Sequence, residues 1–260
     1  MLIQVLPVAV ANTLRQLDAI DVERYDSVAN SLFARWDFRA STVVPAGGFT
    51  VLNAQNKPYK KLIPIDGNYL TYQPDGLLVQ GYASRGVRSP LFNRDLPHGY
   101  TLCCLATLVG VRDNKILMVM GDQSDSEQST SRTGASIFIS GATENNVFVG
   151  IGGASSSATF YPVQLSVPIF FCLTVENLPN AVNVRGYIKA TGLDHQIPMS
   201  APRPLNDNPR SQIGLGSVDY LSSSTSQNLK YSEFSIFTKP LTAEEVEAEY
   251  QAVKVRHSLQ

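Results

Sequence analysis

The chain has 260 residues and a formal net charge of −1, with 43% hydrophobic and 17% charged residues. The hydrophobic content predicts a folded globular protein, while the near-zero charge and the lack of a basic cluster argue against nucleic-acid binding. No apolar run approaches the roughly 18–20 residues that a membrane-spanning helix needs.

The first 30 residues differ in pattern from the rest of the chain. They begin with the apolar stretch "LIQVLPVAV", which is followed by "TLRQ", a segment with capping-box spacing. We therefore expect an N-terminal arm with a short helix over 1–30 and a main domain over 31–260. An apolar arm can dock on a partner or pack on its own domain, and both alternatives stay open. No Lys or Arg precedes the apolar stretch, so we expect no export signal.

From residue 33 onward, short apolar stretches alternate with turn-forming segments, which is typical of an antiparallel β protein. The lack of long helical patterns between them excludes β-α-β units and predicts one all-β sandwich or barrel. The polar stretches 121–134 and 152–160 are expected as loops at the rim, where binding surfaces often lie. The expected strands are 33–38, 76–82, 99–110, 115–120, 135–140, 146–151, 167–175, 182–188, 211–218 and 229–237.

The last expected strand runs into the segment "TKPLTAEEVEAEY". Simple alternation along this strand places Tyr231 and Glu233 on one face and Phe234 and Ile236 on the other. Pro240 then ends the strand.

A short helix is expected to follow and to pack on the sandwich. Val246, Tyr250 and Val253 share one helix face, as in an amphipathic surface helix. A capping box and a hydrophobic staple mark its start. The residues of these two motifs are Leu241, Thr242, Glu245 and Val246.

This strand-to-helix segment, "EFSIFTKPLTAEE", resembles the way in which many concanavalin A-like, laminin-G-like domains end. The segment "ARWDFRAS" resembles their first core strand, "GYTLCCLATL" their long central strand, "KILMVMGD" the following strand and "SQIGLGS" their glycine-bearing strand. The resemblance covers residues 32–253 and implies a concanavalin A-like jelly roll with an N-terminal arm and a C-terminal helix. It departs from the family at "PIFFCLTV", where Phe170 and Phe171 stand in a strand that often carries a Trp.

Some enzymes of this lectin and glucanase family resemble one another in a Glu-x-Asp-x-Glu strand. Retaining hydrolysis needs two carboxyl groups about 5–5.5 Å apart, which alternate strand positions provide. The nearest match is "AIDVE", in which Ala19 occupies the nucleophile position and which precedes the first sandwich strand. The three histidines lack metal-ligand spacing, and His257 is expected as a solvated tail residue. We therefore expect a protein without enzymatic activity.

Laminin-G-like domains often bind calcium at the sandwich rim, so the resemblance suggests calcium ligands here. Asp and Asn oxygens suit this ion, but nothing in the sequence indicates that the candidates converge. We expect no cofactor, with calcium as the alternative. The candidate ligands are Asp122, Asp125, Asn206 and Asp207.

Three arginines, Arg85, Arg88 and Arg94, lie close together in "SRGVRSPLFNR". They are candidate ligands for a carboxylate or an acidic sugar, and the alternative is a solvated loop. The single tryptophan, Trp36, lies in an apolar strand, so we expect it in the core rather than stacked on a sugar.

The chain has three cysteines, of which Cys103 and Cys104 are adjacent. Neighbouring strand residues face opposite sides, so these two are poorly placed to pair with each other. We expect buried free thiols, and a bridge from Cys172 to one of the other two is the alternative.

These observations favour a non-enzymatic bacteriophage virion protein: a tail-fibre, receptor-binding or decoration component. Few charges, free cysteines, Ser/Thr-rich loops, no export signal and an apolar arm all fit this hypothesis. Such a protein is made in the host cytoplasm and is extracellular as part of the particle. Its expected partners are other virion proteins, further copies of itself and surface glycans, which it would bind multivalently. The alternatives are a secreted or surface lectin and a glycan-cleaving enzyme.

Overall fold

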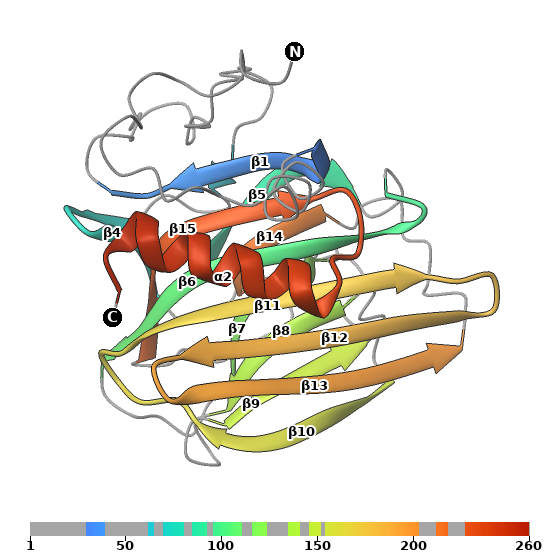
Figure 1. Ribbon diagram of the computed structural model, residues 1–260. Coiled ribbons are helices and arrows are strands. Elements are labelled where there is room, and N and C mark those ends of the chain that lie inside the picture. Colours follow the sequence, from blue (N-terminus) through green and yellow to red (C-terminus); the bar gives the residue numbers. More distant parts are fainter. Residues whose placement is uncertain are drawn as a thin grey trace, which may run out of the picture.

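In the described part of the chain, two antiparallel β-sheets stack face to face and one helix lies against the outside of the first sheet (Figure 1). The predicted all-β sandwich is therefore confirmed, while residues 1–29 of the expected arm lie outside the described ranges. No helix within these ranges is long and apolar enough to cross a bilayer. The computed structural model describes residues 30–39, 62–64, 70–80, 85–92, 96–110, 116–123, 135–140, 146–151, 154–202, 212–217 and 227–259.

The first sheet has eight strands and carries the helix. Its strands are β1 (Leu32–Asp37), β3 (Leu70–Gln73), β4 (Gly76–Gln80), β6 (Gly99–Gly110), β11 (Pro168–Asn177), β12 (Ala181–Ala190), β13 (Leu193–Pro202) and β15 (Gln227–Phe237). They follow the order β13-β12-β11-β6-β15-β4-β3, and β1 also pairs with β15.

The second sheet has seven strands. They are β2 (Ile63–Pro64), β5 (Arg85–Phe92), β7 (Ile116–Gln123), β8 (Ala135–Ser140), β9 (Asn146–Ile151), β10 (Ala154–Pro162) and β14 (Gln212–Ser217). Their order is β10-β9-β8-β7-β14-β5-β2. All ten expected strands are present in the two sheets.

Two segments that were expected as loops are strands. Most of the polar stretch 152–160 belongs to β10, where Ser157 pairs with Val149 of β9, so the backbone ladder forms although the stretch is rich in serine. The arginine-bearing segment forms β5, which pairs with β14 and β2. Of the other polar stretch, 124–134 lies outside the described residues.

The main core lies between the two sheets and contains Trp36. This side chain is fully buried, and its ring stacks on Phe234 of the neighbouring strand at 5.5 Å between ring centroids. The hydroxyl of Tyr231, also fully buried, donates a 2.5 Å hydrogen bond to the carbonyl of Val119 across the core. The expectation that Trp36 is a core residue is confirmed.

A β-bulge in β15 corrects the predicted alternation of this strand. Tyr231 pairs with Ala106 and Glu233 with the adjacent Leu105, so Ser232 is an extra residue opposite β6. The bulge moves Tyr231 to the main core together with Phe234 and leaves Glu233 on the outer face. Simple alternation had placed Tyr231 and Glu233 on one face.

The helix α2 (Ala243–His257) lies across the outer face of the eight-stranded sheet (Figure 1). The predicted capping box is confirmed. The Thr242 hydroxyl accepts a hydrogen bond from the Glu245 amide at 3.3 Å, and the Glu245 carboxylate accepts one from the Thr242 amide at 2.9 Å. The predicted apolar face of the helix packs into a second, smaller core on the sheet, confirming the expected docking. This second core contains Cys103, Leu105, Phe170, Cys172, Tyr187, Phe237, Leu241, Val246 and Val253, with Tyr250 against it.

The cysteines occupy both cores as buried free thiols, as expected. Cys104 points into the main core, while Cys103 lies under α2 opposite Cys172 of β11. Burial raises the pKa of the Cys103 and Cys104 thiols well above their usual value. The thiols are therefore poor nucleophiles in the folded protein.

Strand β13 forms one edge of the eight-stranded sheet and contains two prolines, Pro198 and Pro202. A two-residue turn joins it to β12, so Ala190 and Leu193 form the first hydrogen-bonded pair of the hairpin. Hydrogen-bonded and non-hydrogen-bonded pairs alternate along the hairpin from this pair onward. Pro198 and Pro202 both fall in non-hydrogen-bonded pairs, in which the backbone amide position points away from β12. Proline lacks that amide and is tolerated at a free edge.

Candidate functional site

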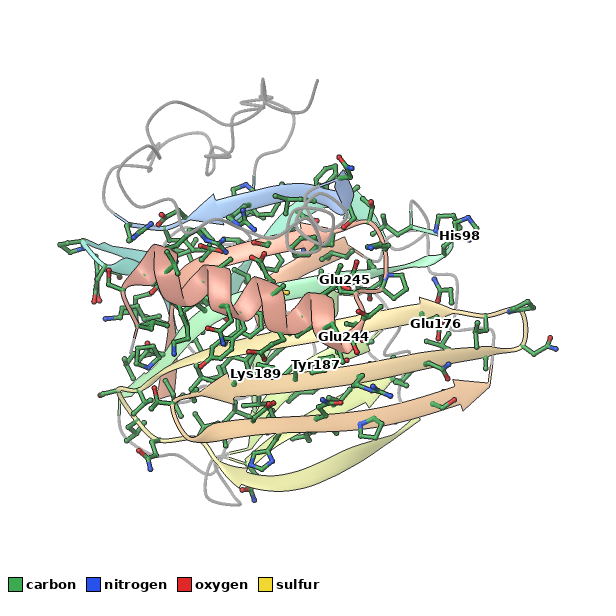
Figure 2. The ribbon with its side chains drawn as sticks, viewed as in Figure 1. His98, Glu176, Tyr187, Lys189, Glu244 and Glu245 are labelled. Atoms are coloured by element: carbon green, nitrogen blue, oxygen red, sulfur yellow. The ribbon has the colours of Figure 1, made fainter. Side chains whose placement is uncertain are left out.

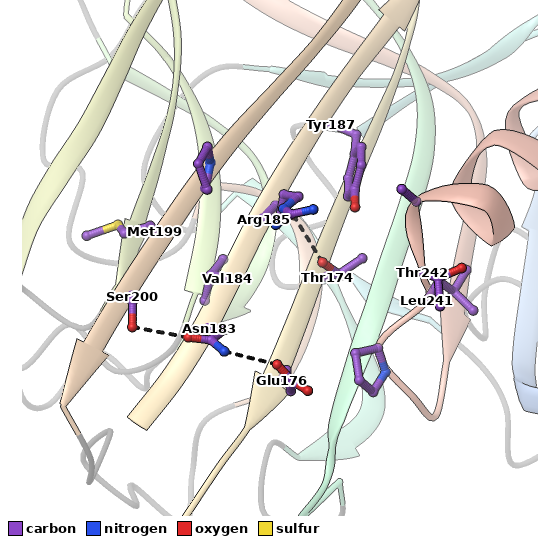
Figure 3. A pocket seen from close by; sticks show the side chains of 13 residues that line it. Thr174, Glu176, Asn183, Val184, Arg185, Tyr187, Met199, Ser200, Leu241 and Thr242 are labelled. Carbon is purple, nitrogen blue, oxygen red and sulfur yellow. Dashed lines mark hydrogen bonds between the residues drawn. The ribbon is translucent and has the colours of Figure 1, made fainter. Parts of the chain in front are cut away.

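A groove of about 670 Å³ lies on the outer face of the eight-stranded sheet, beside the start of α2 (Figure 3). Its floor comes from β11, β12 and β13, and its wall is the segment Pro240–Ala243 that leads into the helix. Figure 2 shows Glu176, Tyr187 and Lys189 following one another along this side of the sheet, beside α2. The floor therefore belongs to a continuous sheet rather than to loops.

A row of three polar side chains crosses the floor at one end. Glu176, Asn183 and Ser200 are directly opposite one another in β11, β12 and β13. The Ser200 hydroxyl donates to Oδ1 of Asn183 at 3.1 Å, and Nδ2 of Asn183 donates to Oε2 of Glu176 at 3.0 Å (Figure 3). All three side chains are exposed. The row thus offers a bonded, oriented set of hydrogen-bonding groups to a ligand.

The next row carries the guanidinium group of Arg185. Arg185 pairs with Thr174 on one side and with Pro198 on the other, and the Thr174 hydroxyl donates to the Arg185 carbonyl at 3.5 Å. Tyr187 lies two residues further along β12 and is only 2% exposed. Burial raises the pKa of the Tyr187 phenol, and a hydrogen bond with Arg185 opposes this shift. The groove therefore combines a cation, a phenol and the polar row.

The wall of the groove is fixed to the sheet by Thr101 of β6. The Thr101 hydroxyl donates to the carbonyl of Lys239 at 2.9 Å and accepts from the amide of Leu241 at 2.8 Å. Leu241 is buried, and the capping box at Thr242 begins the helix directly after it. These contacts hold the wall at a defined distance from the floor.

A buried charge cluster holds α2 on the sheet behind the wall. The Glu233 carboxylate of β15 lies 2.6 Å from Nη2 and 2.9 Å from Nε of Arg256, and 3.2 Å from Nε of Arg35. Glu249 of the helix contacts the same two guanidinium groups, at 2.6 Å to Arg256 and 2.8 Å to Arg35. Burial raises the pKa of Glu233, but hydrogen bonds from His257 and Arg256 and the nearby positive charges outweigh it and lower the pKa to about 2.

His257 is part of this cluster, which corrects the expectation of a solvated tail residue. Its Nε2 lies 2.9 Å from Oε2 of Glu233, and its side chain is 6% exposed. The helix extends to His257 itself, so the last turn carries this ring onto the sheet. This contact joins residues 24 positions apart on different elements, so the position of His257 near the end of the chain does not indicate it.

A second ionic contact anchors the middle of α2. Lys189 of β12 is 4% exposed, and its Nζ lies 2.7 Å from Asp194 and 2.8 Å from Glu247 of the helix. The ammonium also lies 5.8 Å from the ring centroid of Tyr250. Helix and sheet are thus joined by charges as well as by apolar packing.

Two of the three arginines that were predicted as ligands lie in described backbone on the other sheet. Arg85 and Arg88 lie three residues apart in β5 of the other sheet. The Arg85 side chain and all of Arg94 lie outside the described residues, so a cluster of these three arginines stays a prediction.

The calcium prediction has the same status. Asp122 lies in β7, paired with Ile213, but its side chain is outside the described residues, as are Asp125, Asn206 and Asp207. Within the described ranges, no group of three or more His, Cys, Asp or Glu residues could hold a metal ion.

Sequence reasoning did not identify the groove residues. The strands 167–175 and 182–188, which correspond to β11 and β12, were expected, but none of their residues was singled out as a site residue. Yet Asn183, Arg185 and Tyr187 alternate with Val184 and Gly186 in "VNVRGY", which indicates a strand with one polar face. That pattern was visible, but the folding of the C-terminal segment over the same face was not.

No protein-family model matches the chain, and no curated protein matches it. Among solved structures, it is similar to a Trypanosoma rangeli sialidase in complex with sialic acid, with a TM-score of 0.58, 11% identity, and coverage of 86% of this chain and 33% of that chain. It is also similar to a botulinum neurotoxin type C structure that concerns cell entry dependent on two ganglioside molecules, with a TM-score of 0.57, 14% identity, and coverage of 88% and 53%.

A third similar structure is the botulinum neurotoxin serotype D ligand binding domain in complex with N-acetylneuraminic acid, with a TM-score of 0.57, 11% identity, and coverage of 90% and 53%. At such identities the similarity shows the β-sandwich fold alone. The chain spans about a third to a half of the length of these three structures.

Proposed function

We propose that this protein is a non-enzymatic binding module that takes carbohydrate in the groove beside α2. The observation that carries the proposal is the bonded row of Glu176, Asn183 and Ser200 on the open floor of the groove. Sugars present hydroxyl groups that both donate and accept hydrogen bonds, together with apolar C–H faces. The polar row suits the hydroxyls, and the apolar wall at Pro240 and Leu241 suits the C–H faces.

The similar structures add support. Three of them concern sialic acid, gangliosides or N-acetylneuraminic acid. Because this chain matches only part of each of these structures, the ligands named for them suggest a class of ligand for this chain but do not locate its binding site.

A glycan array tests the proposal. The wild-type protein is expected to bind a subset of the printed glycans, and Asn183→Ala is expected to weaken that binding at least about tenfold, because it breaks the row at its centre. Gln251→Ala is the matched control, since Gln251 is an exposed amide on α2 whose partner is Glu247. Absence of any bound glycan, or equal binding by the Asn183 variant, would contradict the proposal.

The groove chemistry favours binding over cleavage. Most glycosidases act through two carboxyl groups, and Glu176 is the carboxylate among the described residues of this groove, already engaged by Asn183. The Tyr187 phenol has a raised pKa, which disfavours it as a nucleophile. Incubation of the protein with bacterial capsular polysaccharide should release no new reducing ends. Release above that of a boiled-protein control would show glycan-cleaving activity and contradict a non-enzymatic function.

More specifically, we propose that the protein is a bacteriophage virion component that displays this binding module on the particle. Its buried free thiols fit synthesis in a reducing cytoplasm, and repeated copies would convert weak glycan contacts into avidity. Other virion proteins and further copies of the chain are the proposed partners.

Peptide mass spectrometry of purified particles tests the virion proposal, with the protein expected among their structural components. The alternative is an exported lectin. The segment Ala9-Val10-Ala11 has the Ala-x-Ala pattern of a signal-peptidase site. A native intact mass lacking about the first eleven residues would therefore favour export and oppose the virion proposal.

A further inference from the structure

The guanidinium group of Arg185 differs from most described cations in its surroundings. Among the residues that the structure describes, Arg185 has no carboxylate within ion-pair distance. It is nevertheless exposed inside the groove. The described cations that have a carboxylate within 4 Å include Arg35, Arg39, Lys189, Lys230, Lys239 and Arg256.

Arg185 is also oriented by its neighbours. Its backbone lies in the middle of a three-strand ladder, between Thr174 and Pro198. Its side chain lines the groove together with that of Tyr187 (Figure 3). The Tyr187 ring is fixed in the second core, between the sheet and α2. The guanidinium group is planar and presents its N–H groups in a fixed fork, so it can bind a carboxylate through two parallel hydrogen bonds.

The charge of the groove is therefore divided along β12. At one end of the floor, the negatively charged Glu176 carboxylate accepts a hydrogen bond from Asn183. Two residues further along β12, Arg185 supplies a positive charge that has no acidic partner among the described residues. A purely anionic ligand lying along the floor would be repelled at the Glu176 end. A neutral sugar would leave the guanidinium without a counter-charge.

We propose that the ligand of the groove is a carboxylate-bearing glycan, with its carboxylate on Arg185 and its hydroxyl groups on the row of Glu176, Asn183 and Ser200. The inference rests on the proposed function, because it names the ligand class of the same site. It assigns Arg185 as the residue that sets specificity, while the polar row supplies recognition that neutral and acidic sugars share.

The experiment uses an array of acidic polysaccharides and oligosaccharides printed beside their carboxyl-reduced counterparts, in which each carboxylate is a CH₂OH group. The wild-type protein should bind the acidic members at least about tenfold more tightly than the reduced ones, the usual value of a charge-assisted hydrogen bond. Arg185→Gln should remove this difference without lowering the thermal midpoint. Lys254→Gln, which removes one positive charge in the last turn of α2, should keep it.

The outcomes separate the two proposals. Three results would overturn the carboxylate inference while leaving glycan binding intact. They are equal binding of acidic and reduced glycans, stronger binding of glycans whose only charged group is a sulfate, and an unchanged preference for acidic glycans in Arg185→Gln. Failure of the wild-type protein to bind any printed glycan would overturn the proposed function, and the inference with it.

Discussion

The charge cluster beneath α2 should make Glu233→Gln a strongly destabilising substitution. The Glu233 side chain is 2% exposed, and its pKa of about 2 compares with an ordinary value of 4.5. That difference corresponds to about 3 kcal/mol of stability at neutral pH. Glutamine keeps the shape but not the charge, and it leaves the guanidinium groups of Arg256 and Arg35 with Glu249 as their remaining described carboxylate partner. We expect the free energy of unfolding to fall by about 3 kcal/mol, as for other broken buried ion pairs.

The stability difference between wild type and Glu233→Gln should become smaller as the pH falls. Because the pKa of Glu233 is lower in the folded state, its contribution is fully present above about pH 4.5 and is lost as the pH falls toward 2. Urea denaturation followed by the fluorescence of the single buried Trp36 measures this at several pH values. The gap between wild type and variant should narrow from about 3 kcal/mol at pH 7 to under about 1 kcal/mol near pH 2.

A surface carboxylate provides the control for this experiment. Glu244 is exposed in the first turn of α2, and Glu244→Gln should cost less than about 1 kcal/mol. The reasoning would be refuted by a cost below 1 kcal/mol for Glu233→Gln at pH 7, or by a gap that stays constant with pH.

Three further outcomes can be measured. Thr242→Ala removes the capping-box acceptor of α2 and should lower the free energy of unfolding by about 1 kcal/mol in urea; an unchanged value would mean that tertiary contacts alone fix the helix start. Tyr231→Phe leaves the Val119 carbonyl without a buried donor and should cost about 1–3 kcal/mol, which a thermal melt beside wild type would show; a neutral result would indicate that another donor reaches the carbonyl. Finally, all three cysteines are buried, so an aromatic disulfide reagent should find no reactive thiol in the folded protein and three in denaturant; rapid reaction without denaturant would contradict their burial.

The C-terminal segment shows which parts of the fold the sequence can predict. Local rules were sufficient for the strand break at Pro240 and for the cap at Thr242, because both depend on residues within one turn of each other. They were also sufficient for the sandwich, since alternating apolar stretches recur along most of the chain.

The bulge at Ser232 shows where local rules fail. An extra residue in one strand is defined only by its pairing with β6, and no pattern within β15 marks it. It decides that Tyr231 enters the main core while Glu233 meets the helix. The environment of His257 follows from the same long-range pairing, because its partner Glu233 lies on β15.

The groove was missed for a related reason. Its floor is visible as an alternation in "VNVRGY", but a floor becomes a groove only where Pro240–Ala243 crosses the sheet beside it. The Ser-rich strand β10 was missed because its polar composition is typical of a loop, and its pairing with β9 outweighs that propensity.

The two prolines of β13 also bear on how copies of this protein can be packed close together. An exposed sheet edge is a template for strand addition and for fibril growth. At Pro198 and Pro202, the edge has no amide that could donate a hydrogen bond to the carbonyl groups of an incoming strand. Sheet fusion through β13 is therefore disfavoured, so two copies of this protein are not expected to join their sheets along this edge.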